Sequence, residues 1–296
     1  MIFENTAQAC LEQKAGVPYL SFPVLSQFPF LKHGFSTRLG GVSRGILASM
    51  NFGSDSGPYQ DSTENVQENY RRIAKALGVE VRSMVISKQV HKTNIRRVTE
   101  EDCGKGLFLP RDYDEIDGLI TNRPNITLVT KYADCVPLYF VDPVKKAIGL
   151  THSGWRGTVA GIGRITIEEM KNAYDCKTED IIAVIGPSIC RKCFEIGEAV
   201  AKEFERAFPN YKENILTPIK PSAVSVSKDG VTPLQESKYQ CDLWSANKAV
   251  LLQAGLNAEQ IHISGVCTGC NSKLLFSHRK TQGKRGSLAA FLSLCE

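Results

Sequence analysis

Three residues of this chain offer the nitrogen and sulfur donors that a transition-metal site requires. His91 ends the segment MVISKQVH, Cys135 follows an aspartate in ADCVPLYFVD, and His152 precedes the turn SGWRG. One thiolate and two imidazoles suit zinc and leave a fourth coordination position open, as in catalytic zinc sites. The spacings between them are long, so residue type alone is also compatible with a small packed cysteine and two hydrogen-bonded structural histidines.

The elements around these residues are expected to bring them together, because each adjoins an apolar run of strand length. Strands are predicted over 84–91, 126–131, 136–142, 147–152, 181–187 and 260–266, and helices over 61–77, 158–174, 197–208 and 242–256. Residues 17–41 alternate apolar and polar side chains with prolines, which is typical of strands near a sheet edge. Short meandering strands alternating with helices predict an α/β protein with mixed β-sheets. Strand ends in such folds project into a common crevice.

The turn after His152 has features of an anion site. Gly154 and Gly157 allow the backbone to approach a ligand closely, and Arg156 carries a forked donor that matches phosphate. The predicted helix that follows begins with free N–H groups. We therefore expect an anionic group to bind beside the candidate metal.

Composition limits the classes of partner. A net charge of +5 is mild, and the chain lacks the clustered basic stripe of a nucleic-acid binder. The longest basic run, HRKTQGKRG, is interpreted as a solvated loop. We found neither an apolar run of membrane-spanning length nor a signal peptide, so we expect a cytoplasmic protein without a membrane partner. We expect a single domain over 1–296, as a monomer or a homodimer.

Ten cysteines are many for a chain of this length. Cys190 and Cys193 form one C-x-x-C pair, and Cys267 and Cys270 form another. Two such pairs could build a structural four-cysteine zinc site or a redox pair. Neither pair has the strand–helix context of a thioredoxin motif, so packed or surface thiols are the expectation.

Seven segments extend the argument beyond residue types. They are STRLGGVSRGILASMNFG, KQVH, DGLITNRPNITLVTKYADCVPLYFVDP, HSGWRGTVAGI, GPSICRKCFEIG, DLWSANKAVLLQAG and FSHRKTQGKRG. In this order, over roughly residues 33–293, the chain resembles the YfiH/YlmD family, which was labelled multicopper polyphenol oxidoreductase (laccase domain) and is now regarded as zinc-dependent purine nucleoside phosphorylases. The resemblance implies a four-layer α/β/β/α fold and Zn²⁺ held by His91, Cys135 and His152.

The resemblance also implies an activity. Phosphate would cleave adenosine, inosine, guanosine or methylthioadenosine, and adenosine would also be deaminated. Arg38 of FSTR and Arg156 are then candidate phosphate ligands, and Asn51 is a further candidate for substrate binding. Asp117 and Asp134 are candidates for the acid–base role, Asp117 also as a substrate-binding residue, and Cys135 counts as catalytic as well as metal-binding.

Asp134 depends on a local bend of the chain. Neighbouring residues on a regular strand face opposite sides, so Asp134 reaches the same site as Cys135 only if the chain bends between them. Without the bend, Asp134 would be a carboxylate that caps a turn or orients a ligand histidine.

Two rival enzymes and one binding module stay open. The family's older label suggests a copper-dependent polyphenol oxidase, but five histidines are too few for coupled copper centres. Alternatively, a metal-free Cys135 could be the nucleophile of a hydrolase acting on peptidoglycan precursors. The metal could also have a purely structural role in a non-enzymatic binding module. The open coordination position argues against this alternative.

Overall fold

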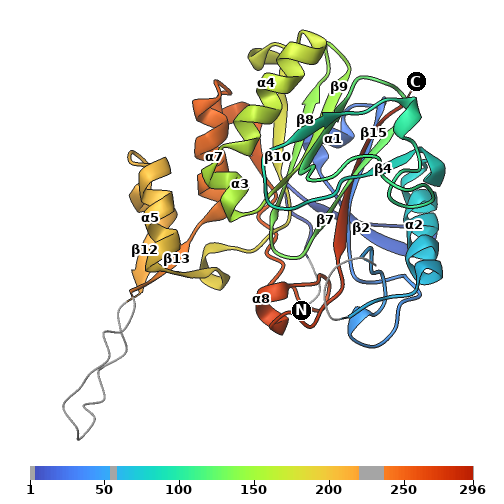
Figure 1. The fold of residues 1–296 in the computed structure, drawn as a ribbon, viewed down its shortest axis with the longest axis horizontal. Coiled ribbons are helices and arrows are strands. Elements are labelled where there is room, and N and C mark those ends of the chain that lie inside the picture. Colours follow the sequence, from blue (N-terminus) through green and yellow to red (C-terminus); the bar gives the residue numbers. More distant parts are fainter. Residues whose placement is uncertain (1–3, 54–58, 220–236, 296) are drawn as a thin grey trace, which may run out of the picture.

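Two six-stranded sheets form the centre of the computed structural model, which describes residues 4–53, 59–219 and 237–295 (Figure 1). The first sheet contains, in spatial order, β1 (Cys10–Lys14), β2 (Val17–Ser21), β3 (Leu31–Ser36), β15 (Leu288–Leu294), β7 (Thr127–Tyr132) and β4 (Met84–Ile86). The second contains β14 (Ile261–Ile263), β10 (Ile182–Ile185), β8 (Val136–Asp142), β9 (Ala147–Ser153), β6 (Gly118–Thr121) and β5 (Ile95–Arg97). Each sheet has parallel and antiparallel pairs, which confirms the predicted mixed α/β class.

The alternation of side chains along the strands packs the two sheets against each other. In β15, Leu288, Ala290 and Leu292 join the apolar cluster between the sheets, whereas Ala289 and Phe291 face the opposite side. Strands β8 and β9 also contribute side chains to both faces, and every residue of these two strands is buried. Near-continuous apolar strands are typical of sheets that are covered on both faces.

Helices cover the outer faces. On the first sheet lies α2 (Thr63–Leu77), which begins at the cap Ser62 and ends at Gly78 with a left-handed φ of 70°. On the second lie α4 (Ile162–Tyr174) and α7 (Leu243–Gln253), on the opposite side of the molecule in Figure 1. The serine before the first turn of α2 and the glycine after its last are residues that helix ends prefer.

A smaller sheet extends from this body. It consists of β11 (Glu195–Gly197), β13 (Lys238–Cys241) and β12 (Leu216–Ile219), and it packs with α5 (Glu198–Ala207) and α6 (Lys212–Ile215). Two further short helices are α1 (Pro23–Ser26) and α8 (His278–Thr281). Among the described residues, no helix combines the length and apolar character needed to cross a membrane.

Two element predictions were wrong in detail. The strand expected to run to His91 ends at Ile86, so His91 lies in a loop. The helix predicted over 158–174 is interrupted: α3 (Trp155–Val159) stops, and Gly161, with a left-handed φ of 74°, precedes α4. A glycine in this conformation ends one helix and redirects the chain into the next.

Candidate metal centre and active site

The three candidate ligands meet at one end of the second sheet. The donor atoms of His91, Cys135 and His152 all lie within 4.8 Å of one another. The Sγ atom of Cys135 is 3.8 Å from Nε2 of His91, and the two imidazole rings cross at 77° with centroids 4.9 Å apart. Cys135 directly precedes β8 and His152 lies in β9, and these strands are antiparallel neighbours. Strand pairing therefore places the thiol and one imidazole together.

His91 reaches the same point through an irregular loop. Its backbone has a φ of 64°, which is uncommon for a residue with a side chain. The ring packs against Gly154, where a Cβ atom would lie 2.6 Å from Cδ2 of His91. Gly154 is therefore needed for close approach of the imidazole.

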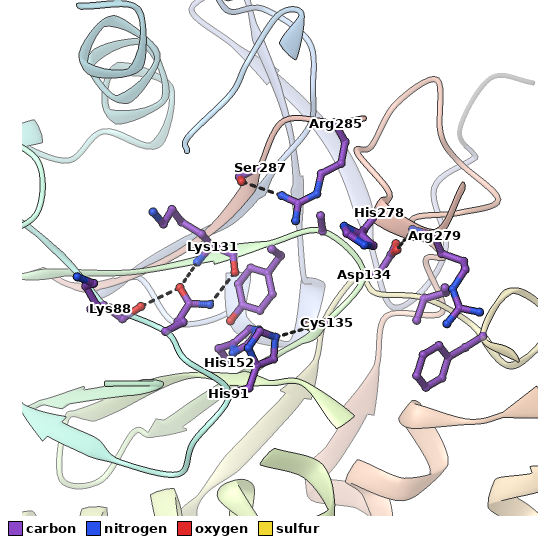
Figure 2. Close-up of a pocket in the computed structure, with 16 residues that line it drawn as sticks. Lys88, His91, Lys131, Asp134, Cys135, His152, His278, Arg279, Arg285 and Ser287 are labelled. Atoms are coloured by element: carbon purple, nitrogen blue, oxygen red, sulfur yellow. Dashed lines mark hydrogen bonds between the residues drawn. The ribbon is translucent and has the colours of Figure 1, made fainter. Parts of the chain in front are cut away.

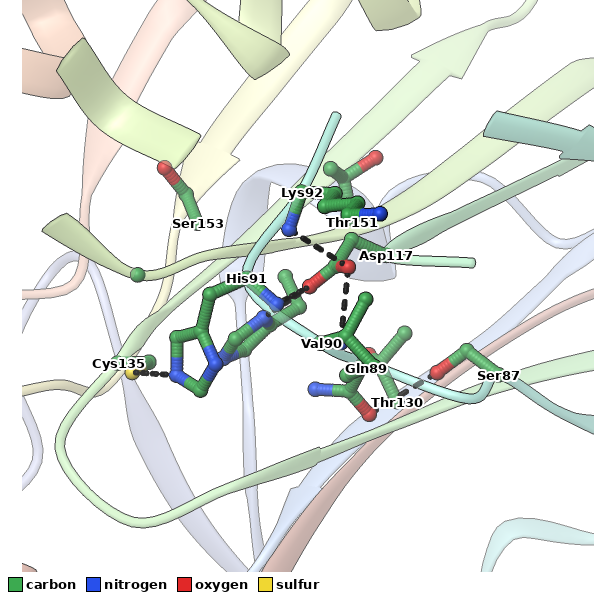
Figure 3. A network of polar contacts seen from close by, with 12 residues as sticks. Ser87, Gln89, Val90, His91, Lys92, Asp117, Thr130, Cys135, Thr151 and Ser153 are labelled. Atoms are coloured by element: carbon green, nitrogen blue, oxygen red, sulfur yellow. Dashed lines mark hydrogen bonds and ion pairs between the residues drawn. The ribbon is translucent and has the colours of Figure 1, made fainter. Parts of the chain in front are cut away.

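A buried carboxylate holds both histidines (Figure 3). Asp117 is fully buried and accepts hydrogen bonds from the backbone N–H groups of Val90, His91 and Lys92, each at 3.0 Å. Its Oδ1 also lies 2.8 Å from Nδ1 of His152. This contact leaves Nε2 of His152 as the nitrogen that faces the thiol. Asp117, predicted to bind substrate or to move protons, is thus placed behind the ligands and does not line the cavity.

The charges of the cluster favour a thiolate. Burial alone would raise the pKa of Cys135, but the two histidines beside it bring the pKa down to about 6. Burial alone would lower the pKa of His152, but Cys135 and Asp117 raise it to about 9. Burial also acts upward on the pKa of Asp117, which the His152 ring and the backbone N–H groups nevertheless hold below its ordinary value.

These residues fit a zinc ion. The donor set is one sulfur and two imidazole nitrogens, and the environment stabilises the thiolate form that binds metals. The Asp117 carboxylate orients one imidazole in the way that ligand histidines require. Three protein ligands leave one coordination position for water or substrate.

The cluster opens into a cavity of about 570 Å³ (Figure 2). This volume is within the range of small-molecule sites. Its lining includes four cationic side chains, Lys88, Lys131, Arg279 and Arg285, and the imidazole of His278. Arg285 enters from the side opposite His91 and His152 in Figure 2. The cavity therefore combines the candidate metal ligands with groups that attract an anion.

Arg285 has an orientation suited to a ligand. Its Nη1 atom donates to Oγ of Ser287 at 3.1 Å, and its Nε is buried with no hydrogen-bond partner among the described residues. Burial lowers the pKa of Arg285, while Asp134 and Cys135 act in the opposite direction. A buried guanidinium donor without a partner is costly unless a ligand accepts its hydrogen bond.

Asp134 lines the same cavity because the chain bends before Cys135. Its φ is 90°, and the residue lies between the ends of β7 and β8. Oδ1 accepts from Thr268 Oγ1 at 2.6 Å, and Oδ2 accepts from the backbone N–H of Arg279 at 2.7 Å. The carboxylate and the thiol thus belong to one site, which a regular strand would have prevented.

Like Asp117, the other three predicted substrate ligands lie outside the cavity lining. Arg38 donates to the carbonyl oxygens of Ala48 and Ser272 and stacks on Phe276. The buried Asn51 bonds Gly53, Asp61 and the backbone N–H of Ser287. The exposed Arg156 lies over the Trp155 ring, 4.3 Å from its centroid, on the five-residue helix α3. The contacts of Arg38 and Asn51 therefore join loops of the protein, and Arg156 rests on its neighbour's ring.

The cationic wall of the cavity, formed by Lys88, Lys131, Arg279 and Arg285, was missed by sequence reasoning. The run HRKTQGKRG, interpreted as a solvated loop, is largely exposed, but it also contributes His278, Arg279 and Arg285 to the cavity. A signal was present, because FSHRKTQGKRG was one of the segments that carried the family resemblance. Local composition gave no indication that this segment folds back beside Asp134, a contact made with the backbone of Arg279 at 2.7 Å.

Known proteins share both sequence and fold with this chain. Residues 32–295 match the family described as multi-copper polyphenol oxidoreductase laccase. The chain is 36% identical to purine nucleoside phosphorylase YlmD of Bacillus subtilis, over 89% of this chain and 88% of that protein. It is 32% identical to adenosine deaminase RL5 of an unknown prokaryotic organism, over 70% and 74% of the two chains. The crystal structure of the Bacillus licheniformis protein YfiH superposes with a TM-score of 0.82 at 30% identity, covering 96% and 98% of the two chains.

Proposed function

The chain belongs to the multi-copper polyphenol oxidoreductase laccase family, and from this premise we propose that it is a zinc-dependent purine nucleoside phosphorylase. Its substrates would be inorganic phosphate and adenosine, inosine, guanosine or methylthioadenosine. The products are the free base and ribose 1-phosphate, or methylthioribose 1-phosphate. Relatives at 36% and 34% identity carry the name purine nucleoside phosphorylase, which supports the reaction class.

One observation carries the proposal: a single cavity has a metal-ligand cluster on one side and a cationic wall on the other (Figure 2). Phosphorolysis needs a bound anion next to the ribose and stabilisation of the charge that develops as the base leaves. Arg285 and the neighbouring cationic groups supply the anion site. The cavity volume of about 570 Å³ accommodates a nucleoside beside it.

Metal binding, phosphate binding and proton transfer are assigned to different residues of the cavity. His91, Cys135 and His152 would hold the zinc ion, which supplies a Lewis acid that binds and orients an oxygen ligand. Arg285 offers its forked donors to phosphate, whose oxygen forms the new bond to C1′ while the bond from C1′ to the purine nitrogen breaks. The leaving purine takes the electron pair and needs a proton, for which Asp134 at the cavity wall is the candidate carrier.

Adenosine deamination is a second candidate function. It is favoured by the relative named adenosine deaminase and by the position of Asp134, a carboxylate in the cavity next to the ligand Cys135. Hydrolytic deamination adds water at the purine C6 and releases ammonia, and it requires a carboxyl group to move the protons. The same cavity would then serve both reactions, with the nucleoside bound in a different orientation for each.

The two rival enzymes fit the cavity less well. Among the described residues, the cluster beside the cavity contains two histidines and one cysteine, which is too few ligands for a coupled copper centre. A thiol nucleophile would need Cys135 free of metal, yet its sulfur shares the cluster with two imidazole donors. Each rival predicts an activity that an assay can detect.

The test is a set of parallel assays on protein purified without added metal. Inosine should yield hypoxanthine and ribose 1-phosphate only when phosphate is present, and a chelator should remove the activity until zinc is restored. Phenol oxidation by a copper-loaded sample, without phosphate-dependent base release, would support the laccase activity instead. Activity that survives the chelator but not a thiol alkylator would support the cysteine hydrolase.

A further inference from the structure

A second group of metal-type donors lies outside the cluster described above. The two C-x-x-C pairs, expected to be separate packed or surface thiols, come together: the sulfurs of Cys190, Cys193, Cys267 and Cys270 all lie within 4.8 Å of one another. One pair belongs to the turn after β10 and the other to the segment after β14, and these two strands are parallel neighbours. Strand pairing therefore places the four cysteines close together.

The distances match one tetrahedral ion. Zinc–sulfur bonds of about 2.3 Å in a tetrahedron separate the sulfurs by about 3.8 Å. The Sγ atom of Cys270 lies 3.6 Å from that of Cys193 and 4.0 Å from that of Cys190. In an iron–sulfur cluster the four thiolates are divided between two or among four iron atoms, so the sulfurs stand farther apart. The geometry thus favours a single ion with four sulfur ligands.

The surrounding backbone is arranged for such a centre. The N–H groups of Cys190 and Cys270 donate to Sγ of Cys267 at 3.3 and 3.4 Å, which stabilises negative charge on that sulfur. Gly269 lies against the other pair, where an added Cβ atom would be 3.3 Å from Sγ of Cys193. The absence of a side chain at Gly269 lets the two loops close on each other.

We propose that Cys190, Cys193, Cys267 and Cys270 bind one Zn²⁺ ion as a closed structural site, separate from the centre at His91, Cys135 and His152. Binding converts four thiols into four thiolates and releases four protons, with no change of oxidation state. Because all four coordination positions come from the protein, this ion does not take part in the reaction.

The site fastens two loops that form part of the cavity wall. Ile189 and Phe194, on either side of the first cysteine pair, line the cavity. Thr268, inside the second pair, donates its hydroxyl hydrogen to Asp134 at 2.6 Å. The loops also bond each other, because the N–H of Thr268 donates to the carbonyl of Ser188 at 3.1 Å. A zinc ion here would fix the positions of Asp134 and Phe194 at the wall of the substrate cavity.

Metal content tests the proposal without reference to catalysis. The full chain, expressed with zinc and purified under reducing conditions, should contain two zinc ions per chain by elemental analysis. His91→Ala should retain one, and zinc-edge absorption of this variant should show four sulfur neighbours at about 2.3 Å. The double variant Cys193→Ser/Cys270→Ser should also lose one ion. The control Cys10→Ser/Cys295→Ser, at two cysteines outside both clusters, should keep two.

Several results would overturn the proposal. One zinc ion in the wild type and none in His91→Ala would show that the cysteine group binds no metal. Iron in place of zinc would contradict the assignment of the metal. A disulfide found by mass spectrometry in the reduced preparation would show that the cysteines pair with each other and do not bind zinc. If the double cysteine variant fails to fold, the absorption spectrum of His91→Ala still decides, because all four cysteines are intact there. Loss of nucleoside cleavage alone would concern the proposed function and leave this site unaffected.

Discussion

The Nδ1 atom of His152 lies 2.8 Å from Oδ1 of Asp117, and both side chains are buried. The same carboxylate accepts hydrogen bonds from three backbone N–H groups of the loop that carries His91. One aspartate therefore sets the orientation of one ligand and the position of another. In a metal centre, partners of this kind tune the affinity of the ligands they hold.

Asp117→Asn is expected to weaken zinc binding by about 10- to 100-fold, because the amide neither carries the charge nor accepts the imidazole N–H in the same way. Competition with a chromophoric chelator measures the affinity. Asp114→Asn is the control, since this exposed aspartate, three residues before Asp117, contacts Lys88 at 3.8 Å and accepts from the N–H of Glu115 at 2.8 Å. Equal zinc affinities in the two variants would contradict the role of Asp117.

Arg285→Ala is expected to raise the KM for phosphate by roughly 10- to 100-fold, the effect of losing a hydrogen bond to a charged partner. The KM for inosine should change less, because the guanidinium is assigned to the anion. Arg156→Ala and Lys284→Ala are the controls, since neither residue lines the cavity. If Arg156→Ala gives the larger effect on phosphate, the helix start at SGWRG is the anion site after all.

Asp134→Asn is expected to reduce adenosine deamination by about 100-fold or more, which is the usual contribution of a positioned proton carrier. Zinc content should stay the same, because Asp134 is not a ligand in the proposed centre. Thr268→Val, which removes the 2.6 Å hydrogen bond to this carboxylate, should have a smaller effect in the same direction. Unchanged deamination in Asp134→Asn would assign the residue to loop structure alone.

His33 is expected to make stability depend on pH. Burial lowers its pKa to about 4, and the neutral ring accepts a hydrogen bond at Nε2 from the Phe22 N–H. Between pH 6.5 and 4 the unfolded chain therefore binds more protons than the folded one, so the free energy of unfolding decreases as the pH falls. The full loss is about 3 kcal/mol below the folded pKa and is absent above about pH 6.5.

The measurement is urea unfolding of the wild type and of His33→Gln between about pH 7 and pH 4. The variant should show a flatter dependence of the unfolding free energy on pH over this window. Lys32→Gln, an exposed neighbour on the same strand, should follow the wild type. Parallel curves for wild type and His33→Gln would show that His33 is not the group responsible.

Local patterns predicted the elements that depend on short-range chemistry. The serine cap and terminal glycine of α2 are local features, and the apolar runs of β8 and β9 are buried on both faces. Cys135 and His152 follow from those strands, because each lies at a strand end. His91 was a candidate ligand by residue type, but no local pattern could place it, since its loop is held by the distant Asp117.

Long-range contacts explain what the sequence did not reveal. Arg285 precedes β15, a strand that was not predicted and that pairs with β3 and β7 from distant parts of the chain. The orientation of an arginine is equally invisible in a motif: Arg38 points to the carbonyl of Ser272, far away in sequence. The two cysteine pairs meet for the same reason, through the parallel pairing of β10 and β14.

The most direct test of the central claim is a crystal structure with phosphate and a non-reactive nucleoside, with diffraction recorded at the zinc edge. We predict an anomalous peak among His91, Cys135 and His152, with phosphate between that peak and Arg285 and the purine near Asp134. Absence of zinc at these three residues, or phosphate bound outside the cavity, would contradict the account.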